Sequence, residues 1–173
     1  MDPGEARILE ALDAAVRSKA VESKLDAMAV RVETKLRERA GEVLAWEPVP
    51  LNLYPGPLPK SIRSSWVFIL RAGAVTGAER HPNSRQRMMS YRGSGDFQTR
   101  TGPEWRSHFL KSDAALPLEK RWISIPPLVW HQAVVPPENW VVVSFHTASE
   151  EDLIEERPSE NDSTVRRKYS EEA

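Results

Sequence analysis

The sequence predicts an all-β fold, either a sandwich or a small barrel, with a helical segment in front of it. Short apolar segments alternate with proline- and glycine-rich turns between residues 42 and 147, as is typical of antiparallel sandwiches and barrels. The chain has 14 prolines and 8 glycines, which disfavours an all-helical fold. Apolar spacings of three and four are confined to residues 1–41, so we expect long helix only there.

Residues 1–41 are predicted to form an N-terminal helical extension. Asp2 can cap a helix whose first turn contains Pro3, and Gly41 is a natural stop. An unbroken helix of this length would extend for about 57 Å, which exceeds the width of a small domain. We therefore expect either a break near Lys19–Ser23 or a helix that projects to meet a partner. Its apolar stripe either packs on its own domain or mediates a homodimer.

Residues 42–147 are predicted to form the β-barrel. The expected strands are 66–70, 86–92, 121–125, 134–135 and 140–145. The segment 96–119 reads as a long connection, and such loops often close over ligands. Its aromatic residues Phe97, Trp105 and Phe109 either form a lid or a dimer contact.

Residues 148–173 are predicted to form an acidic tail without chemistry. They carry 4 basic and 9 acidic groups. A short helix over 150–156 is compatible with the sequence, and residues 158–163 have the composition of a solvated stretch.

Composition excludes several classes of function. The chain has no cysteine, which excludes disulfides, thiolate metal sites and a cysteine nucleophile. No apolar run approaches the roughly 18 residues of a membrane span, the N-terminus has no signal-peptide pattern, and the mean hydropathy is -0.51. We therefore expect a cytoplasmic protein with no membrane partner. The net charge of -1 gives no case for nucleic acid as a partner, and no nucleophile-elbow motif is present.

Two histidines, His81 and His131, have unusual surroundings. The first spacing is Gly73, five residues, Glu79-x-His81, four residues, Gln86, six residues, Gly93. The second is Pro126-x-Leu128, two residues, His131. These spacings resemble the two motifs of the cupin superfamily, over residues 60–146. The first family motif is Gly, five residues, His-x-His, three or four residues, Glu, six residues, Gly, and the second is Pro-x-Gly, two residues, His.

The resemblance implies a double-stranded β-helix, or jelly-roll barrel, whose motif positions point inward and hold a divalent metal. Transferred position by position, it gives the ligand set Glu79, His81, Gln86 and His131. Four positions depart from the family: Glu79 replaces a His, Gln86 replaces a Glu, Leu128 replaces a Gly, and Val135 stands where an Asn is usual.

The residue chemistry supports the same set independently. Glu79 and His81 are two residues apart, so on a strand both face one side. With His131 they make two imidazoles and one carboxylate, the facial triad favoured by non-haem Fe(II); Mn, Ni and Zn are alternatives. Glu79 and His131 are the predicted catalytic residues, and Gln86 is either a weak ligand or orients a metal-bound water.

Strand alternation from Gln86 places Met88 and Arg92 on the same predicted inner face. Together the three residues are the predicted substrate-binding set. Arg92 either clamps a substrate carboxylate or phosphate or is a solvated rim residue, and Met88 either lines the cavity or fills the core.

The remaining candidate residues are expected to lie outside the site. Alternation turns Trp130 and Tyr91 outward. His146 ends an apolar run and is expected at the surface, as is His108 in a charged segment.

These observations predict a metal-dependent dioxygenase or hydroxylase acting on a small polar or anionic organic substrate. The first alternative is a binding or regulatory module with no metal, in which Glu79 and Gln86 recognise the ligand. In that case Glu79 is expected to pair with Arg80, Arg85, Arg92 or Arg121. The second is a structural homodimer with a vestigial site.

Overall fold

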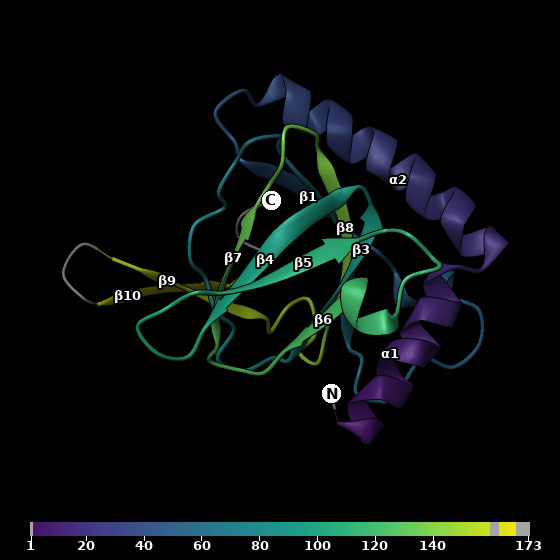
Figure 1. Cartoon of the computed structure of the whole chain (residues 1–173). Helices are drawn as coiled ribbons and strands as arrows, with labels where there is room; N and C mark the ends of the chain where they lie inside the picture. Colours follow the sequence, from purple (N-terminus) through teal and green to yellow (C-terminus); the bar gives the residue numbers. More distant parts are fainter. Residues whose placement is uncertain (1, 160–162, 169–173) are drawn as a thin grey trace.

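The computed structural model describes residues 2–159 and 163–168. Two helices, α1 (Pro3–Val16) and α2 (Lys19–Glu38), lie along one face of a β-structure (Figure 1). The strands are β1 (Leu44–Pro48), β2 (Ser64–Leu70), β3 (Gln86–Arg92), β4 (Ser94–Arg100), β5 (Arg106–Lys111), β6 (Trp122–Ile125), β7 (Trp130–Val134), β8 (Trp140–His146), β9 (Ile154–Pro158) and β10 (Thr164–Lys168). No helix among the described residues is long and apolar enough to cross a membrane.

The helical region breaks at Arg17–Ser18, slightly before the predicted position. Ser18 has an extended backbone, with φ -66° and ψ 135°, and it caps α2. The Asp2 carboxylate accepts a hydrogen bond from the Glu5 amide at 3.2 Å, which confirms the predicted cap of α1.

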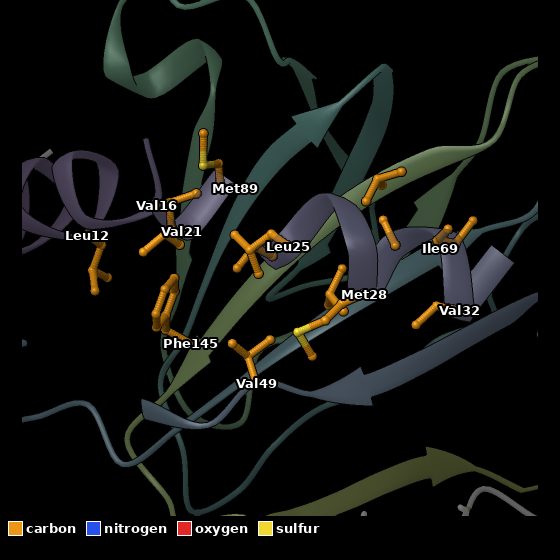
Figure 2. Close-up of a cluster of buried hydrophobic side chains, with 14 of the residues drawn as sticks. Leu12, Val16, Val21, Leu25, Met28, Val32, Val49, Ile69, Met89 and Phe145 are labelled. Carbon is orange, nitrogen blue, oxygen red and sulfur yellow. The ribbon is translucent and has the colours of Figure 1, made fainter. Parts of the chain in front are cut away.

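The apolar stripe of the helices packs on the protein's own β-sheet. Figure 2 shows Val21 and Leu25 of α2 facing Met89 and Phe145 of the sheet. The fully buried members include Leu9, Leu12, Val16, Val21, Leu25 and Val32. We call this cluster the helix-side core; burial of each such side chain contributes about 1.5–3 kcal/mol.

The strands form two main antiparallel sheets. The five-stranded sheet has the order β1-β2-β8-β3-β6, and the three-stranded sheet has the order β5-β4-β7. Among the described residues, three single bridges extend the smaller sheet: Val75 and Glu79 pair with Val134 and His131 of β7, and Arg80 pairs with Glu156 of β9. The hairpin of β9 and β10 therefore continues that sheet.

A second core fills the space between the two sheets, and we call it the barrel core. Its members include Trp66, Phe68, Met88, Phe97, Ile125, Ala133 and Val142. This all-β, double-stranded arrangement with helices at the N-terminus confirms the predicted fold class.

Two regions differ from the sequence prediction. The segment 96–119 is not a long loop, since β4 and β5 pair over six residues from Ser94↔Lys111 to Thr99↔Arg106. The segment 150–156 is not a helix, because β9 begins at Ile154. Part of the predicted solvated stretch, residues 160–162, lies outside the described residues.

Candidate metal centre

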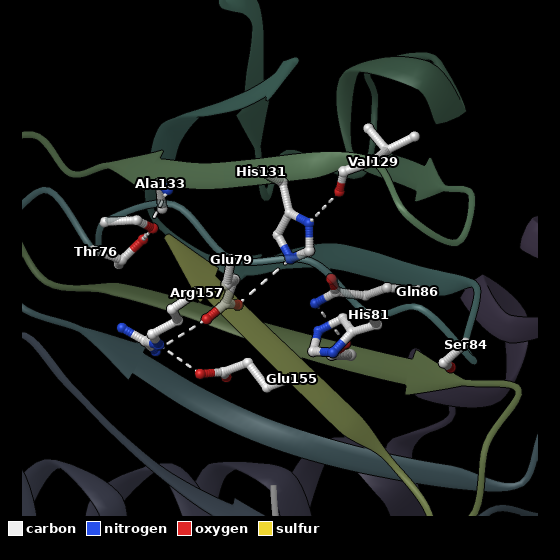
Figure 3. A network of polar contacts seen from close by, with 12 residues as sticks. Thr76, Glu79, His81, Ser84, Gln86, Val129, His131, Ala133, Glu155 and Arg157 are labelled. Carbon is white, nitrogen blue, oxygen red and sulfur yellow. Dashed lines mark hydrogen bonds and ion pairs between the residues drawn. The ribbon is translucent and has the colours of Figure 1, made fainter. Parts of the chain in front are cut away.

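Three side chains from distant parts of the sequence meet inside the barrel. Glu79 and His81 lie on the segment that pairs with β7, and His131 is the second residue of β7. One ligand atom from each lies within 4.8 Å of the other two (Figure 3). A coordination sphere with bonds of about 2.1 Å spans about 4.2 Å, so the three atoms are close to the spacing that one ion requires.

Backbone carbonyls orient both imidazole rings. His131 Nδ1 lies 3.1 Å from the Val129 carbonyl oxygen, and His81 Nδ1 lies 3.0 Å from the Ile154 carbonyl oxygen. A ring that donates its Nδ1–H to a carbonyl carries its lone pair on Nε2. Metal-binding histidines are typically fixed in this way by an outer carbonyl or carboxylate.

The contact between His131 and Glu79 brings an imidazole nitrogen close to a carboxylate oxygen. His131 Nε2 is buried without a hydrogen-bond partner and lies 3.4 Å from Glu79 Oε1. With its proton on Nδ1, a neutral imidazole would direct a lone pair at a carboxylate oxygen. A second proton on the ring or a bound cation relieves this repulsion. The donor set of one carboxylate and two imidazoles therefore fits a divalent transition metal.

Glu79 is held as a carboxylate. Burial opposes its ionisation, but contact with His131 and the positive charge of Arg157 keep its pKa well below the usual range of a glutamate. Arg157 Nη2 lies 3.1 Å from Glu79 Oε2 (Figure 3). Arg157 thus occupies one oxygen, and the other faces His131.

His81 is neutral at physiological pH. Burial is the main cause, and the charge of His131 adds to it; together they lower the pKa of His81 to about 4. A neutral imidazole is the form that binds a metal.

Gln86 extends the centre toward the five-stranded sheet. Its Nε2 donates to Ser144 Oγ at 3.2 Å, whereas its Oε1 is buried without a hydrogen-bond partner. Figure 3 shows this amide beside the rings of His81 and His131. The orphaned oxygen can therefore serve a ligand bound at the centre.

Comparisons with known proteins address the fold. No family model and no curated protein matches the sequence. Among solved structures, the coconut allergen cocosin is similar with a TM-score of 0.52 and 13% identity, over 71% of this chain and 30% of that one. An 11S globulin from Wrightia tinctoria with an auxin binding site has a TM-score of 0.52 and 14% identity, over 70% of this chain and 29% of that one.

The fold is a cupin jelly roll. An oxalate oxidase bound to the substrate analogue glycolate also matches, with a TM-score of 0.46 and 15% identity, over 72% of this chain and 55% of that one. The chain spans less than a third of the length of cocosin and of the globulin. These likenesses concern the cupin fold alone.

The other two predicted substrate-binding residues, Met88 and Arg92, have different surroundings in the structure. Met88 is 2% exposed and belongs to the barrel core. Arg92 does not lie on the same face of β3 as Gln86, because the register of β3 shifts between Ser90 and Arg92. Its guanidinium is half exposed and binds Asp26 of α2 at 2.7 Å, so the inward orientation predicted by alternation is wrong.

His146 corrects the sequence prediction, since it is buried rather than at the surface. It is 1% exposed and its ring centroid lies 4.9 Å from that of His81. Its Nε2 lies 3.0 Å from Ser144 Oγ and its Nδ1 lies 3.3 Å from Ser84 Oγ. Burial is the main cause that holds the pKa of His146 well below its usual range. His146 lies directly opposite Gln86 in the pairing of β3 with β8. A prediction of this strand register from the sequence would have placed His146 beside Gln86.

Arg157 is the second residue that sequence reasoning missed. It lies in the tail to which no chemistry was assigned, yet it contacts Glu79 and Glu155. The charged residues of β9 gave no strand signal in the sequence, although Glu155 is fully buried in this strand.

The remaining aromatic and histidine candidates lie around the site or outside it. Phe97 is buried and stacks on His131 with centroids 5.5 Å apart, so it supports the centre directly. Trp130 lies under the Arg80 guanidinium and Tyr91 donates to Asp26, as expected for outward residues. His108 is half-buried and bonds to Thr99. Trp105 packs with Arg100, and Phe109 is 69% exposed.

Proposed function

We propose that Glu79, His81 and His131 hold a divalent metal ion in the barrel. The observation that carries this proposal is the convergence of Glu79, His81 and His131, each of which offers one ligand atom within 4.8 Å of the other two. The carbonyl-oriented rings and the lowered pKa of Glu79 supply the ligands in their binding-competent forms.

The function that this centre supports best is a metal-dependent oxygenase, either a dioxygenase or a hydroxylase, for a small polar or anionic organic substrate. A facial triad of two histidines and one carboxylate is typical of Fe(II) oxygenases, with Mn, Ni and Zn as alternatives. The bound metal would supply Lewis-acid activation and, as Fe(II), activation of oxygen.

The protein's own residues would orient the substrate. Gln86 Oε1 is positioned to accept a hydrogen bond from a hydroxyl or a water, because its amide nitrogen is engaged by Ser144. Arg157 holds one oxygen of Glu79 and so fixes the carboxylate plane. Met88 and Phe97 close the interior with apolar surface that excludes water.

One observation favours a second candidate, a metal-free module that binds a small ligand. Arg157 already supplies Glu79 with a positive partner at 3.1 Å, which is the pairing expected of a carboxylate without a metal. In that case Glu79 and Gln86 would recognise the ligand.

Metal analysis of protein purified without added metal tests the proposal. We expect about one ion per chain, lost in His81→Ala and His131→Ala because each removes a ligand. His108→Ala is the matched control, since it removes a half-buried histidine outside the centre and should retain the ion. A wild-type chain without metal, and with ligand-induced thermal shifts insensitive to chelator, would favour the metal-free module.

Substrate-dependent oxygen uptake by the Fe(II)-loaded protein then tests catalysis. Uptake that disappears in His131→Ala supports an oxygenase, and a metal-loaded protein that binds ligands without turnover supports a sensor. The cytoplasmic location and the homodimer stay predictions, and sedimentation of the full chain tests the second.

A further inference from the structure

A cavity of about 580 Å³ opens next to the centre, between the edge strand of one sheet and the hairpin that continues the other. It is lined by the last turn of α2, by β1, and by one arginine from each strand of the β9–β10 hairpin. Its volume lies in the range of small-molecule sites, about 300–1,000 Å³. We call it the edge cavity.

Arg157 connects the edge cavity to the proposed centre. Its side chain lines the cavity, and its Nη2 lies 3.1 Å from Glu79 Oε2. Leu44 and Trp46 form another part of the wall and also pack against the barrel core. The cavity therefore adjoins the barrel core along β1, and the Arg157 side chain both lines the cavity and contacts Glu79 of the centre.

The charges around the cavity favour an anion once a metal is present. Four basic side chains line it: Lys35, Arg39, Arg157 and Arg167. Four carboxylates accompany them: Glu38 and Glu42 in the lining, and Glu79 and Glu155 behind it. The four positive and four negative charges cancel. A divalent ion bound at the centre would therefore leave two positive charges to attract an anionic ligand.

The C-terminal end of α2 does not oppose an anion. Helix carbonyls at this end would normally present negative charge. Arg71 neutralises them, because its guanidinium donates to the carbonyl oxygens of Leu36, Arg39 and Glu42 at 2.6–2.8 Å.

We propose that the edge cavity is the anion-binding end of the active site and receives an organic acid. Arg157 binds the carboxylate through its planar guanidinium and links it to Glu79 of the proposed centre. Lys35 and Arg39, both exposed at the rim, attract the anion. This inference rests on the proposed metal function and adds the substrate class and the residue that recognises it.

Titration calorimetry of the Mn²⁺-loaded full chain tests the inference. The probes are succinate and its uncharged analogue succinamide. We expect succinate to bind at least about tenfold more tightly, because a charge-assisted bond is lost in the amide. Arg157→Gln should weaken succinate binding by at least about tenfold while retaining stoichiometric Mn²⁺. Arg157→Lys, which keeps the charge, should restore part of the loss.

Two further variants keep the test decisive. Lys35→Gln/Arg39→Gln changes only exposed helix positions and should weaken succinate binding by about threefold through lost attraction, even if Arg157→Gln folds poorly. Arg37→Gln is the matched control, because Arg37 is 72% exposed and pairs with Glu33 outside the cavity lining; it should bind like the wild type.

The outcomes separate the two proposals. A wild-type chain that takes up no Mn²⁺ overturns the metal function and this inference together. A chain that takes up Mn²⁺ but binds succinate no better than succinamide overturns the inference alone. The same holds if Lys35→Gln/Arg39→Gln and Arg157→Gln both bind succinate like the wild type.

Discussion

On the helix side of the five-stranded sheet, Glu5 is a carboxylate surrounded by donors. Arg87 binds both of its oxygens at 2.7 and 2.9 Å, and Ser124 donates to one of them at 2.6 Å. On the barrel side, Glu79 receives Arg157 on one oxygen, while its other oxygen faces a ring nitrogen that makes no hydrogen bond. Both oxygens of Glu5 therefore receive hydrogen bonds, which stabilises the fold, whereas Glu79 Oε1 faces His131 Nε2 and is suited to a cation.

The two sides of the five-stranded sheet also differ in the polar side chains that they bury. The helix-side core is nearly all aliphatic and aromatic. The barrel side places Gln86, Ser144 and His146, all at most 6% exposed, beside its apolar residues. Buried polar groups cost stability unless they are hydrogen-bonded, and the helix side also buries Arg87 and Ser65. Among the described residues, however, the three buried histidines His81, His131 and His146 lie together on the barrel side, which is the side of the candidate centre.

The largest expected effect comes from truncating one phenylalanine on each face. Phe145 lies in the helix-side core, and Phe97 lies in the barrel core against His131. Phe145→Ala and Phe97→Ala should each lower the free energy of unfolding by about 3–5 kcal/mol. Only Phe97→Ala should also weaken Mn²⁺ binding, by about tenfold, since it removes the support of His131. Urea denaturation and metal titration measure the two effects, and equal metal affinities would break the comparison.

A smaller effect is expected at acid pH. Burial of Glu5 opposes its ionisation, but its bonds to Arg87 and Ser124 hold its pKa below the ordinary 4.5. A carboxylate with a lowered pKa in the folded protein stabilises it above the unfolded pKa, and that contribution is lost as the pH falls. Glu5→Gln should therefore be less stable at pH 7 and lose less stability between pH 5 and 3.

Thermal unfolding across this pH range measures the change. The matched control is Glu10→Gln, an exposed position on the same helix, which should follow the wild-type curve. A Glu5→Gln curve parallel to the wild type would contradict the role assigned to the pair.

The smallest expected effect comes from replacing two buried serines, one on each side of the five-stranded sheet. Ser65 bonds to Tyr54 on the helix side at 2.8 Å, and Ser144 links Gln86 to His146 on the barrel side. Each alanine variant should cost about 1–2 kcal/mol in stability. Ser144→Ala alone should shift metal affinity, by a few-fold, because Gln86 loses its anchor. If Ser65→Ala shifts it equally, the effect is general loosening of the fold.

The sequence predicted the strands whose apolar residues face a core. The segments 66–70, 86–92 and 140–145 all fall within observed strands. Burial on both faces gives 66–70 and 140–145 nearly continuous apolar runs, and alternation predicts 86–92. The sequence did not predict β4, β5 and β9, because their polar and charged residues give no hydrophobic pattern. The backbone groups of these strands are satisfied by pairing with neighbouring strands. Tertiary context decides such strands.

The candidate centre shows the same limit. The spacing of Glu79, His81 and His131 sufficed to predict that they converge. Arg92 was misplaced because a bulge interrupts the alternation of β3, and bulges leave little trace in a single sequence. Arg157 was missed because its role depends on pairing between segments 76 residues apart, through Arg80 and Glu156.

The bridge between Arg80 and Glu156 also fixes the order in which the centre can be assembled during synthesis. His81 is held by a carbonyl 73 residues further along the chain, and Glu79 is held by a guanidinium 78 residues further along. A growing polypeptide on the ribosome therefore exposes its histidines well before it has the parts that orient them. Under the proposed function, the ion would therefore be bound only after β9 has been translated, because residues of β9 orient Glu79 and His81.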